Sequence, residues 1–405
     1  MTKPNPRSVQ VIALTGSFGS GCSYIAREIM TKRGYCCLSL SDALKEAFKA
    51  ETGRDPSQVP RRELQDFGDR IRRAKGSGFF AEEAVKRIRG ATDKTNGRKW
   101  LVDSIRNPVE VKALREGFPG LFLFGIYADK ETRWERVREK YNDDRRRFDL
   151  DDRNDTGRDS DRCGQRVGDC FYGADVVLRN DDHVEVVGNE AFQGLDSKVG
   201  GYVDLVESPL GRQQPIRPEE ALMAMAYAAS EQSSCLKRKV GAIITDPLGN
   251  AISSGFNEVP PQERPCSSDY AGCYREHVWK KFLSALQKKH LVTVDDANQF
   301  EEVFRATFRM LDICRAIHAE ENALLNLVRS GSSVPLENCT LYTTTFPCRM
   351  CANRIAKLRV GRVVYLEPYP DDMPKRILDK GGVLHKFFEG VAFRSYFRIY
   401  GEERI

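Results

Sequence analysis

CRAIHAEENALL at residues 314–325 and TTTFPCRMCANRIAKLR at residues 343–359 decide the fold of the second half of this chain. His318 and Glu320 stand in the first stretch, before an apolar-periodic run, and Cys348 and Cys351 begin the periodic run of the second. Cysteines three positions apart at the start of a helix lie on one face, where the helix dipole favours thiolates. The two cysteines can therefore share one metal ion.

One imidazole and two thiolates give a metal ion three protein ligands. This leaves the fourth tetrahedral position of zinc for water, whereas a closed structural site would need a fourth protein ligand. Zinc makes a bound water acidic enough to supply hydroxide near neutral pH. We therefore expect Glu320 to be the general acid/base, which takes a proton from the water and delivers it to the substrate. The alternative is a zinc knuckle that only braces the fold.

The pairing of H-x-E with P-C-x-x-C is the signature of zinc deaminases, and residues 218 to about 370 resemble the cytidine and deoxycytidylate deaminase superfamily. KRKVGAIITD (237–246) and GFNEVP (255–260) match its deoxycytidylate branch as well. The resemblance implies a catalytic Zn²⁺ and a deoxycytidine nucleotide substrate, whose 4-amino group becomes a carbonyl.

The same resemblance assigns roles to three further residues. It implies that Asn257 binds the sugar, that Lys239 lies near the phosphate and that Tyr369 faces the base. The alternative for Asn257 is a turn residue.

A second group of metal-ligand types precedes the catalytic helix, in a long insert. Some phage deoxycytidylate deaminases carry an additional structural zinc, and the resemblance suggests one here. Its ligands would come from Cys235, Cys266, Cys273 and His277. The alternative is that these are unliganded side chains in a loop.

The elements around the two motifs predict a cytidine-deaminase-like α/β/α sandwich over residues 218–405. A linker is expected at residues 207–217, where prolines and a glycine follow one another before a helix that begins near Pro218. We expect helices at 219–232, 319–330 and 348–359, and strands at 240–246, 251–257, 339–345 and 362–367.

Residues 1–206 predict a separate α/β domain with a parallel sheet. Its strands are expected at VQVIALTG (9–16), 99–104, 120–128 and 174–180, with helices between them. The run from Asp143 to Arg162 is almost entirely polar and lacks apolar periodicity, so we expect a mobile lid or a solvated loop rather than a core element.

A glycine-rich turn follows the first strand with the spacing of a P-loop, in which backbone N–H groups cradle phosphate. Its candidate nucleotide-binding residues are Gly16, Ser17, Gly19, Ser20, Gly21, Cys22 and Ser23. Cys22 replaces the lysine that normally reaches the phosphates, so we expect nucleotide binding or sensing rather than phosphoryl transfer.

LVDSIRNPVEVKAL (101–114) and GQRVGDCFYGADVVLRN (164–180) resemble nucleoside monophosphate kinases. Asp103 ends a strand where a carboxylate linked to Mg²⁺ would sit, and the alternative is a helix cap or a turn. The first domain is therefore expected to hold a nucleotide, with Mg²⁺ as a further candidate.

A kinase-like P-loop domain ahead of a deoxycytidylate deaminase domain is similar to the bacterial antiphage deoxycytidine-nucleotide deaminases. This resemblance covers nearly the whole chain. It implies depletion of dCTP and dCMP during phage infection, a homo-oligomer and, in some members, a regulatory RNA partner.

Composition sets the outer limits of these interpretations. The chain has 405 residues, 40% hydrophobic and 30% charged, which is typical of a globular protein of two domains. Its start lacks an apolar signal segment and no run is long enough to cross a bilayer, so we expect a cytoplasmic protein in which 12 cysteines form no disulfide framework. A net charge of +6 suits phosphate-bearing ligands.

Three rival functions stay open at this point. A polynucleotide base deaminase would need a basic groove with stacking aromatics, and no such stripe stands out. A signalling protein that only senses nucleotides is disfavoured by Glu320 beside an open zinc site. A combined kinase and deaminase is disfavoured by Cys22.

Overall fold

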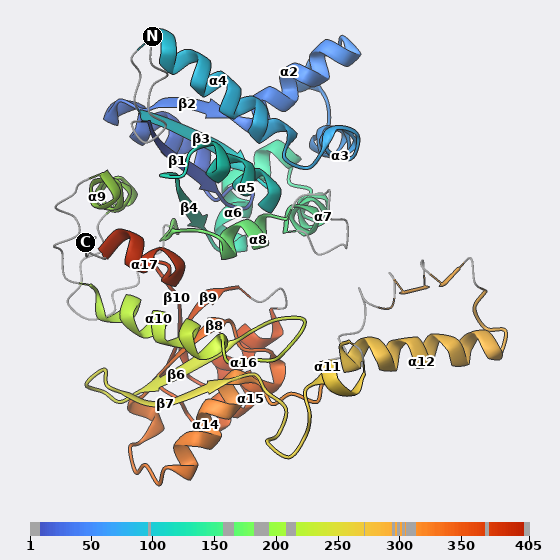
Figure 1. The fold of residues 1–405 in the computed structure, drawn as a ribbon, viewed down its shortest axis with the longest axis vertical. Helices are drawn as coiled ribbons and strands as arrows, with labels where there is room; N and C mark the ends of the chain where they lie inside the picture. Colours follow the sequence, from blue (N-terminus) through green and yellow to red (C-terminus); the bar gives the residue numbers. More distant parts are fainter. Residues whose placement is uncertain are drawn as a thin grey trace. The chain divides into compact units, whose positions relative to one another are not determined.

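The structure is a computed structural model that describes most of the chain. The described residues are 9–95, 99–156, 166–181, 194–207, 216–270, 272–293, 296–297, 300–301, 304, 313–368 and 372–400. The chain forms two compact units (Figure 1), Met1–Ile216 together with Glu389–Ile405, and Arg217–Phe388. The boundary after Ile216 falls inside the predicted linker.

The first unit is an α/β structure built on a six-stranded sheet (Figure 1). Its strands are β1 (Gln10–Thr15), β2 (Cys36–Ser39), β3 (Lys99–Ile105), β4 (Phe122–Tyr127), β5 (Val176–Arg179) and β11 (Gly390–Val391). Its helices are α1 (Cys22–Tyr24), η2 (Ile25–Met30), η3 (Thr31–Arg33), α2 (Leu40–Thr52), η4 (Pro56–Gln58), α3 (Arg61–Lys75), α4 (Phe79–Thr95), α5 (Pro108–Gly117), α6 (Lys130–Val137), η5 (Arg138–Tyr141), α7 (Arg145–Thr156), α8 (Val167–Tyr172), α9 (Leu195–Glu207) and α17 (Phe393–Tyr400).

The strand order of this sheet is β11-β5-β4-β1-β3-β2. Strands β1 to β5 are parallel, and β11 is antiparallel to β5. The predicted parallel α/β sheet is confirmed, with β2 and β11 as strands that the apolar pattern did not indicate. From β1 the chain runs to the edge strand β2, returns to β3 beside β1 and then crosses to β4 on the other side, so the strand order switches at β1. In open α/β sheets, ligands bind at the carboxyl ends of the strands beside such a switch.

The core of the first unit lies on β1 and its neighbours because these strands are apolar on both faces. Val11, Ile12, Ala13 and Leu14 of β1 are all fully buried. Such continuous apolar runs are typical of parallel strands that helices cover on both sides. The central strand therefore gives the residues that follow it a fixed starting point.

The acidic and basic run after residue 143 differs from our prediction. Its first half forms α7, and Phe148 of that helix is buried against Val137 and Tyr141. Asp151, Asp152 and Asp155 of α7 are buried as well. The prediction that this run contains no core element is wrong for α7, because one aromatic side chain and paired carboxylates replace apolar periodicity there. The rest of the predicted lid, residues 157–162, lies outside the described residues.

The second unit is a layered α/β structure with a five-stranded sheet (Figure 1). Its strands are β6 (Gly241–Thr245), β7 (Ala251–Phe256), β8 (Thr340–Thr345), β9 (Arg362–Glu367) and β10 (Leu384–Phe387). Its helices are α10 (Pro218–Ser230), α11 (Cys266–Asp269), α12 (Tyr274–Lys288), α14 (Ala319–Arg329), η7 (Leu336–Asn338), α15 (Arg349–Lys357) and α16 (Met373–Lys380). All helices and strands predicted between 219 and 367 are present.

Helices cover both faces of this sheet, whose strand order is β10-β9-β8-β6-β7. Gly241 of β6 faces α10, because a methyl group there would lie 1.9 Å from the Ala226 carbonyl oxygen. Gly255 pairs with Ala242, one position on, and therefore points to the opposite face. A methyl group at Gly255 would lie 2.3 Å from the Ala323 nitrogen of α14. The two glycines let one helix approach each face closely.

The end of the chain departs from the predicted domain of 218–405. From Glu389 onward the chain belongs to the first unit, where β11 pairs with β5. Ser395 of α17 donates a hydrogen bond to the buried Asp175 carboxylate, and Arg398 forms an ion pair with it at 3.4 Å. The prediction that one domain runs to residue 405 is wrong for this stretch. No apolar pattern marks the return, because β11 has only two residues.

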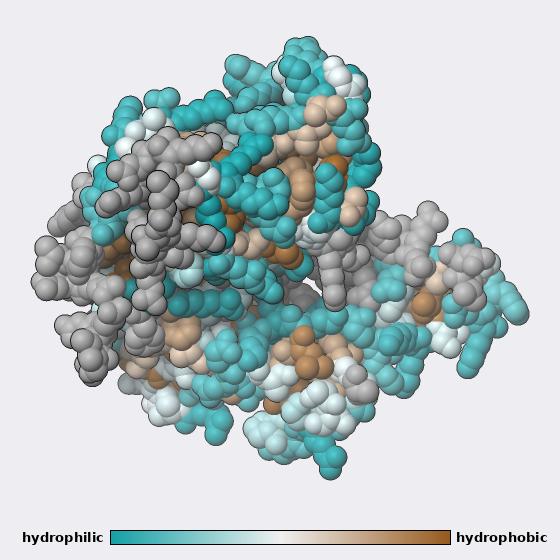
Figure 2. Space-filling view, turned by 45° about the horizontal axis from the view of Figure 1, so that its top comes forward, coloured by the Kyte–Doolittle hydropathy of each residue, from teal (hydrophilic) through white to brown (hydrophobic). Residues whose placement is uncertain are grey.

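In the part of the chain that the structure describes, no helix has both the length and the apolar character to cross a membrane. The face shown in Figure 2 is mostly hydrophilic, with hydrophobic residues gathered in small patches.

Candidate functional site

Two helix N-termini in the second unit hold the predicted metal ligands. His318 is the residue directly before α14, and Cys348 stands directly before α15, which follows β8. Cys351 lies in the first turn of α15, on the same face as Cys348. Both cysteines are buried, so the ligand atoms lie at the inner ends of the two helices.

The three ligand atoms lie close enough together to hold one metal ion. His318 Nδ1 is 3.3 Å from Cys348 Sγ and 3.4 Å from Cys351 Sγ. Nitrogen and sulfur atoms that bind one tetrahedral zinc ion lie roughly 3.5 Å apart, given Zn–N and Zn–S bonds of about 2.0 and 2.3 Å. These three residues form a metal-ligand group among the described residues, and Glu320 is not a member of it. The donors therefore fit zinc with three protein ligands.

The three ligands differ in protonation, because the pKa of Cys348 is lowered whereas hydrogen bonding to Cys348 raises the pKa values of His318 and Cys351. The hydrogen bond from Cys351, with help from His318, lowers the pKa of Cys348 to about 4 against the effect of burial. The hydrogen bond to Cys348 raises the pKa of His318 above its ordinary value. A thiolate is the form of cysteine that binds metals, so Cys348 is ready as a ligand at neutral pH.

Glu320 lies beside this cluster and is buried, with 4% of its surface exposed. Burial raises its pKa to about 7, although the charge of His318 works in the opposite direction. Its carboxyl group also interacts with the Cys351 thiol. A carboxyl group that titrates near neutral pH is suited to accept and return a proton.

The predicted substrate residues have different surroundings. The Asn257 side chain accepts a hydrogen bond from the Val240 nitrogen at 2.7 Å and donates one to the Arg238 carbonyl at 2.9 Å. In this structure, therefore, Asn257 braces the segment before β6. Lys239, on that segment, is exposed and pairs with Glu231 at 2.9 Å. Tyr369 lies outside the described residues.

The predicted second zinc group is not assembled in the structure. No three of Cys235, Cys266, Cys273 and His277 form a metal-ligand group among the described residues. The His277 ring packs against two aromatic rings, at 5.1 Å from Tyr270 and 6.4 Å from Tyr274. A second zinc ion stays a prediction.

Cys314 is a neighbour of that group which the sequence analysis missed. Burial raises the pKa of Cys314, with smaller contributions from Cys235 and Cys273. It belongs to the quoted CRAIHAEENALL stretch and stands only four positions before His318, so its place in the motif could have indicated it.

The glycine-rich turn of the first unit lies at the carboxyl end of β1, as predicted. Gly19 and Gly21 have φ angles of 85° and 102°, the left-handed region that favours glycine. A methyl group at Gly16 would lie 2.4 Å from Ser20 Oγ and 2.5 Å from the Ile126 carbonyl oxygen. The predicted helix after the turn is α1 followed at once by the π-helix η2.

Three side chains from other elements hold the carbonyl groups of this turn. Arg133 donates to the Phe18 carbonyl at 3.2 Å, and Arg136 donates to the Gly19 carbonyl at 3.4 Å. Asn180 donates to the Ser20 carbonyl at 2.8 Å. The conformation of the turn is thereby fixed from outside.

Cys22 and Asp103 lie next to the turn and are not ordinary surface groups. Burial raises the pKa of Cys22 to about 12, so the thiol is neutral and supplies no charge in place of a lysine. Asp103 is buried, its Oδ1 atom has no hydrogen-bond partner among the described residues, and burial raises its pKa. Ser104, the next residue, has a φ of 65°, which is uncommon for a residue other than glycine. A buried carboxylate beside strained backbone is typical of functional sites.

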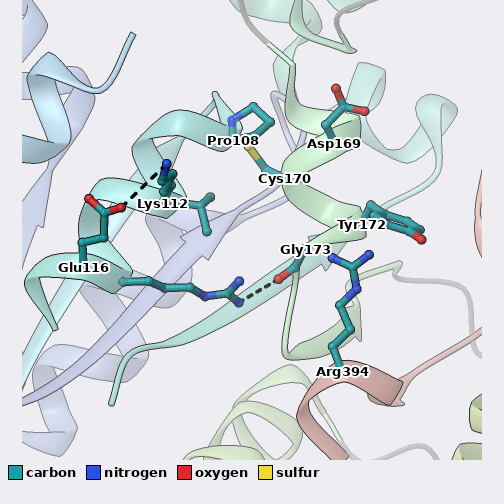
Figure 3. A pocket seen from close by; sticks show the side chains of 10 residues that line it. Pro108, Lys112, Glu116, Asp169, Cys170, Tyr172, Gly173 and Arg394 are labelled. Carbon is teal, nitrogen blue, oxygen red and sulfur yellow. Dashed lines mark hydrogen bonds and ion pairs between the residues drawn. The ribbon is translucent and has the colours of Figure 1, made fainter. Parts of the chain in front are cut away.

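A pocket of about 430 Å³ lies elsewhere in the first unit, between α5 and α8. Arg115 donates to the Gly173 carbonyl at 2.9 Å. Figure 3 shows Lys112 facing Glu116, and Arg394 lies over the Tyr172 ring. None of the predicted site residues lines this pocket.

Comparison with known proteins finds relatives of this chain. The family described as the cytidine and deoxycytidylate deaminase zinc-binding region matches residues 216–367. The deoxycytidylate deaminase of Enterobacteria phage T4 is 33% identical over 160 residues, which cover 38% of this chain and 79% of that protein. A UPF0200 protein of Methanothermobacter thermautotrophicus is 25% identical over 203 residues, which cover 48% of this chain and 97% of that protein.

Among solved structures, the dCMP deaminase of cyanophage S-TIM5 in complex with dCMP and dUMP is 24% identical. The match covers 43% of this chain and 100% of that chain, with a TM-score of 0.29. The family match over residues 216–367 includes His318, Glu320, Cys348 and Cys351.

Proposed function

Because the chain belongs to the cytidine and deoxycytidylate deaminase family, we propose that it converts deoxycytidine nucleotides, dCMP and dCTP, to deoxyuridine nucleotides with release of ammonia. The chain is a hydrolase acting on carbon–nitrogen bonds, and its second unit carries a zinc-dependent deoxycytidylate deaminase domain. The observation that best supports the proposed substrates and chemistry is the buried Glu320 beside a metal-ligand group that has three members among the described residues.

In this mechanism each residue of the cluster has one task. His318, Cys348 and Cys351 would hold the zinc ion, which supplies Lewis acidity to the attacking water. Glu320 accepts a proton from that water and delivers it to ring nitrogen N3, and it then carries a second proton, from the hydroxyl group added at the amine-bearing carbon, to the departing amine. A pKa of about 7 lets Glu320 accept and donate with similar ease at neutral pH.

Asn257 positions the segment that carries Lys239 and takes no part in proton transfer. Its carboxamide ties the end of β7 to residues 238–240, the segment that carries Lys239. A carboxamide has two N–H donors and two acceptor lone pairs, so Asn257 could bind the sugar while it keeps both of these hydrogen bonds. Lys239 would approach the phosphate by leaving Glu231, and its exposed ion pair is weak enough to allow that exchange.

The assay that tests this function compares possible substrates directly. Purified zinc-loaded protein is incubated with dCMP, dCTP, CMP, CTP and single strands containing cytosine, and ammonia and uracil products are measured. We expect turnover of dCMP and dCTP and none of the strands. Turnover of strands in preference to free nucleotides would refute the proposal in favour of a polynucleotide deaminase.

The first unit would act as a nucleotide sensor that controls the second. The glycine-rich turn, Asp103 and the switch in strand order beside β1 support a nucleotide site at the carboxyl ends of the strands. The neutral Cys22 argues against phosphoryl transfer there. A Ser23→Lys substitution tests the control: unchanged deamination and an unchanged response to added nucleotides would refute it.

The biological role we propose is depletion of dCTP and dCMP during phage infection, by a homo-oligomer that a partner RNA can restrain. This role comes from the resemblance of the whole chain to antiphage deaminases. Its test is phage plating on cells that express the wild-type chain or the Glu320→Ala variant. Equal plating efficiency on both would contradict it.

A further inference from the structure

Asp155 of α7 occupies a site that is built for an anion. The side chain is fully buried, and three donors from other parts of the first unit hold its carboxylate. The Phe18 nitrogen of the glycine-rich turn donates at 2.9 Å, Arg61 Nη2 donates at 3.4 Å, and Arg106 Nη1 donates as well. The end of α7 thus fills the space between the turn and two guanidinium groups.

The donors around Asp155 are those that proteins use to bind phosphate. Guanidinium groups and turn N–H groups form charge-assisted hydrogen bonds with phosphate oxygens. Arg106 also lies near Cys22, because its charge acts on the pKa of that thiol. It therefore supplies a positive charge next to the turn, where the sequence has no lysine.

One carboxylate does not satisfy both guanidinium groups. Burial lowers the pKa of Arg106, but the charge of Asp155 outweighs this effect and the net shift is upward. Burial and the charge of Arg106 lower the pKa of Arg61. Arg61 Nε is buried without a hydrogen-bond partner in the part of the chain that the structure describes. An anion with more charge and more oxygens than a carboxylate would fit this pair better.

Two further buried carboxylates hold α7 to neighbouring helices of the first unit. Asp152 accepts from Arg133 Nη1 at 2.5 Å, and the same guanidinium donates to the Phe18 carbonyl. Asp151 accepts from the Tyr141 hydroxyl at 2.9 Å. Loss of the Asp155 contacts would therefore loosen the end of α7 nearest the turn first.

We propose that Phe18 N, Arg61 and Arg106 form a phosphate site that the chain's own Asp155 occupies in the free protein, so that a phosphate-bearing ligand binds by displacing the end of α7. This deepens the proposed nucleotide sensing by the first unit and rests on it. Asp155 acts as an internal competitor, and the apparent affinity for phosphate is reduced by the fraction of molecules in which it is bound.

The first test measures the affinity of the full chain for inorganic triphosphate. The fluorescence of Trp134 reports on α7, because its ring centroid lies 5.4 Å from that of Phe148.

We expect Asp155→Asn to bind triphosphate about tenfold more tightly, since the competing carboxylate is removed. Asp149→Asn removes the same charge from the same helix, where Asp149 pairs with Lys130 at 2.7 Å and not with Arg61 or Arg106, and should stay within about twofold of wild type. Arg106→Gln should bind at least about tenfold more weakly. Equal affinities of wild type and Asp155→Asn would overturn the proposal.

A second measurement uses the unmodified chain and does not depend on how well a variant folds. Triphosphate should increase hydrogen exchange in Arg145–Thr156, and unchanged or slower exchange there would overturn the proposal. Deamination of dCMP is measured on the same samples. If the chain deaminates dCMP while triphosphate leaves hydrogen exchange in α7 unchanged, the proposed phosphate site is refuted and the proposed function is not. If triphosphate loosens α7 but no cytosine nucleotide is deaminated, the proposed function fails and the site stands.

Discussion

His318 Nδ1 lies 3.3 Å from Cys348 Sγ, although the two residues are 30 positions apart in the chain. Each residue directly precedes a helix, so the distance between the ligands depends on where α14 and α15 begin. α14 packs against β6 and β7, and α15 packs against α16 and α14. The candidate metal centre is therefore only as rigid as those helix contacts.

Replacement of Glu320 by Gln should remove the proton carrier and leave the metal ligands in place. We expect the turnover of dCMP to fall by about 10²–10⁴-fold, the usual contribution of a general acid/base. The zinc content, measured by atomic absorption, should stay at the wild-type value.

The control for this variant is Glu321→Gln, the next residue, whose carboxylate pairs with Arg354 at 3.0 Å and is not buried to the same extent. It should keep nearly full activity. If Glu320→Gln retained full turnover, or Glu321→Gln lost as much, Glu320 would not be the general acid/base.

Replacement of Cys351 by Ala should remove a metal ligand and with it the zinc. Structural and catalytic sites release metal when a thiolate is lost, and the remaining buried charges are then uncompensated. We expect less than one zinc per chain, a lower Tm and no measurable turnover, with no recovery when zinc is added. Cys339→Ala is the matched control, since Cys339 is also buried in the second unit but lies outside the ligand group. Full zinc retention by Cys351→Ala would contradict the ligand set.

The second unit could be predicted well from the sequence. Its helices and strands follow clear apolar patterns, and the H-x-E and P-C-x-x-C motifs fix which helix ends meet. The burial of Glu320 could not be read from residue spacing, because it depends on the packing of α14 against the sheet. The two hydrogen bonds of Asn257 are likewise tertiary contacts, and no local pattern indicates them.

The first unit was predicted less completely, for physical reasons that particular elements show. β2 consists of CCLS, which has exposed cysteines and no apolar run, and it lies at the edge of the sheet. The helix α7 is held by carboxylate–guanidinium pairs and Phe148 rather than by an apolar stripe. β11 is brought beside β5 from more than 200 positions away in the chain. Hydrophobic periodicity detects none of these arrangements.

Gly255→Ala tests the close contact between β7 and α14. The added methyl group would lie 2.3 Å from the Ala323 nitrogen and 2.4 Å from the Ala319 carbonyl oxygen, so the helix must move away from the strand. Overpacking of this kind costs about 1–3 kcal/mol in the free energy of unfolding. Because α14 carries Glu320, turnover should also fall. Urea unfolding and dCMP assays measure both effects.

Gly272→Ala is the comparison, since no atom of the residues that the structure describes lies within 4 Å of a methyl group there. It should change neither stability nor turnover. An unchanged urea midpoint for Gly255→Ala would mean that α14 is not held against β7 as described.

Asp103→Asn should stabilise the first unit at neutral pH. The folded-state pKa of Asp103 is raised by burial, so protonated Asp103 favours folding below the ordinary aspartate pKa of about 3.9. That contribution is lost as the pH rises through the folded-state pKa, and the charged, partly unpartnered carboxylate is then a cost. Asparagine has no charge to bury, and we expect a gain of about 1 kcal/mol at pH 7 that shrinks as the pH falls toward 4.

Urea midpoints at several pH values measure this difference. Asp42→Asn is the control, because Asp42 is exposed and pairs with Lys45 at 2.8 Å. It should show no comparable gain. A loss of stability in Asp103→Asn at pH 7 would mean that Asp103 has a favourable partner in the folded chain.

Truncation after Phe388 tests whether the end of the chain completes the first unit. It removes β11 and α17, and with them the buried side chains of Ala392 and Ser395 and two larger buried apolar ones, Val391 and Ile399. Each buried side chain of this kind contributes about 1.5–3 kcal/mol, so the first unit should lose about 3 kcal/mol or more. Asp175 would keep Arg115 and the Leu123 nitrogen but lose Ser395 and Arg398 as partners.

Limited proteolysis with mass spectrometry should then show faster cleavage within residues 9–207, while residues 217–388 resist cleavage and keep their zinc. Truncation after Tyr400 keeps α17 and serves as the control. If the truncation after Phe388 instead destabilised residues 217–388 and spared the first unit, the division of the chain into these two units would be wrong.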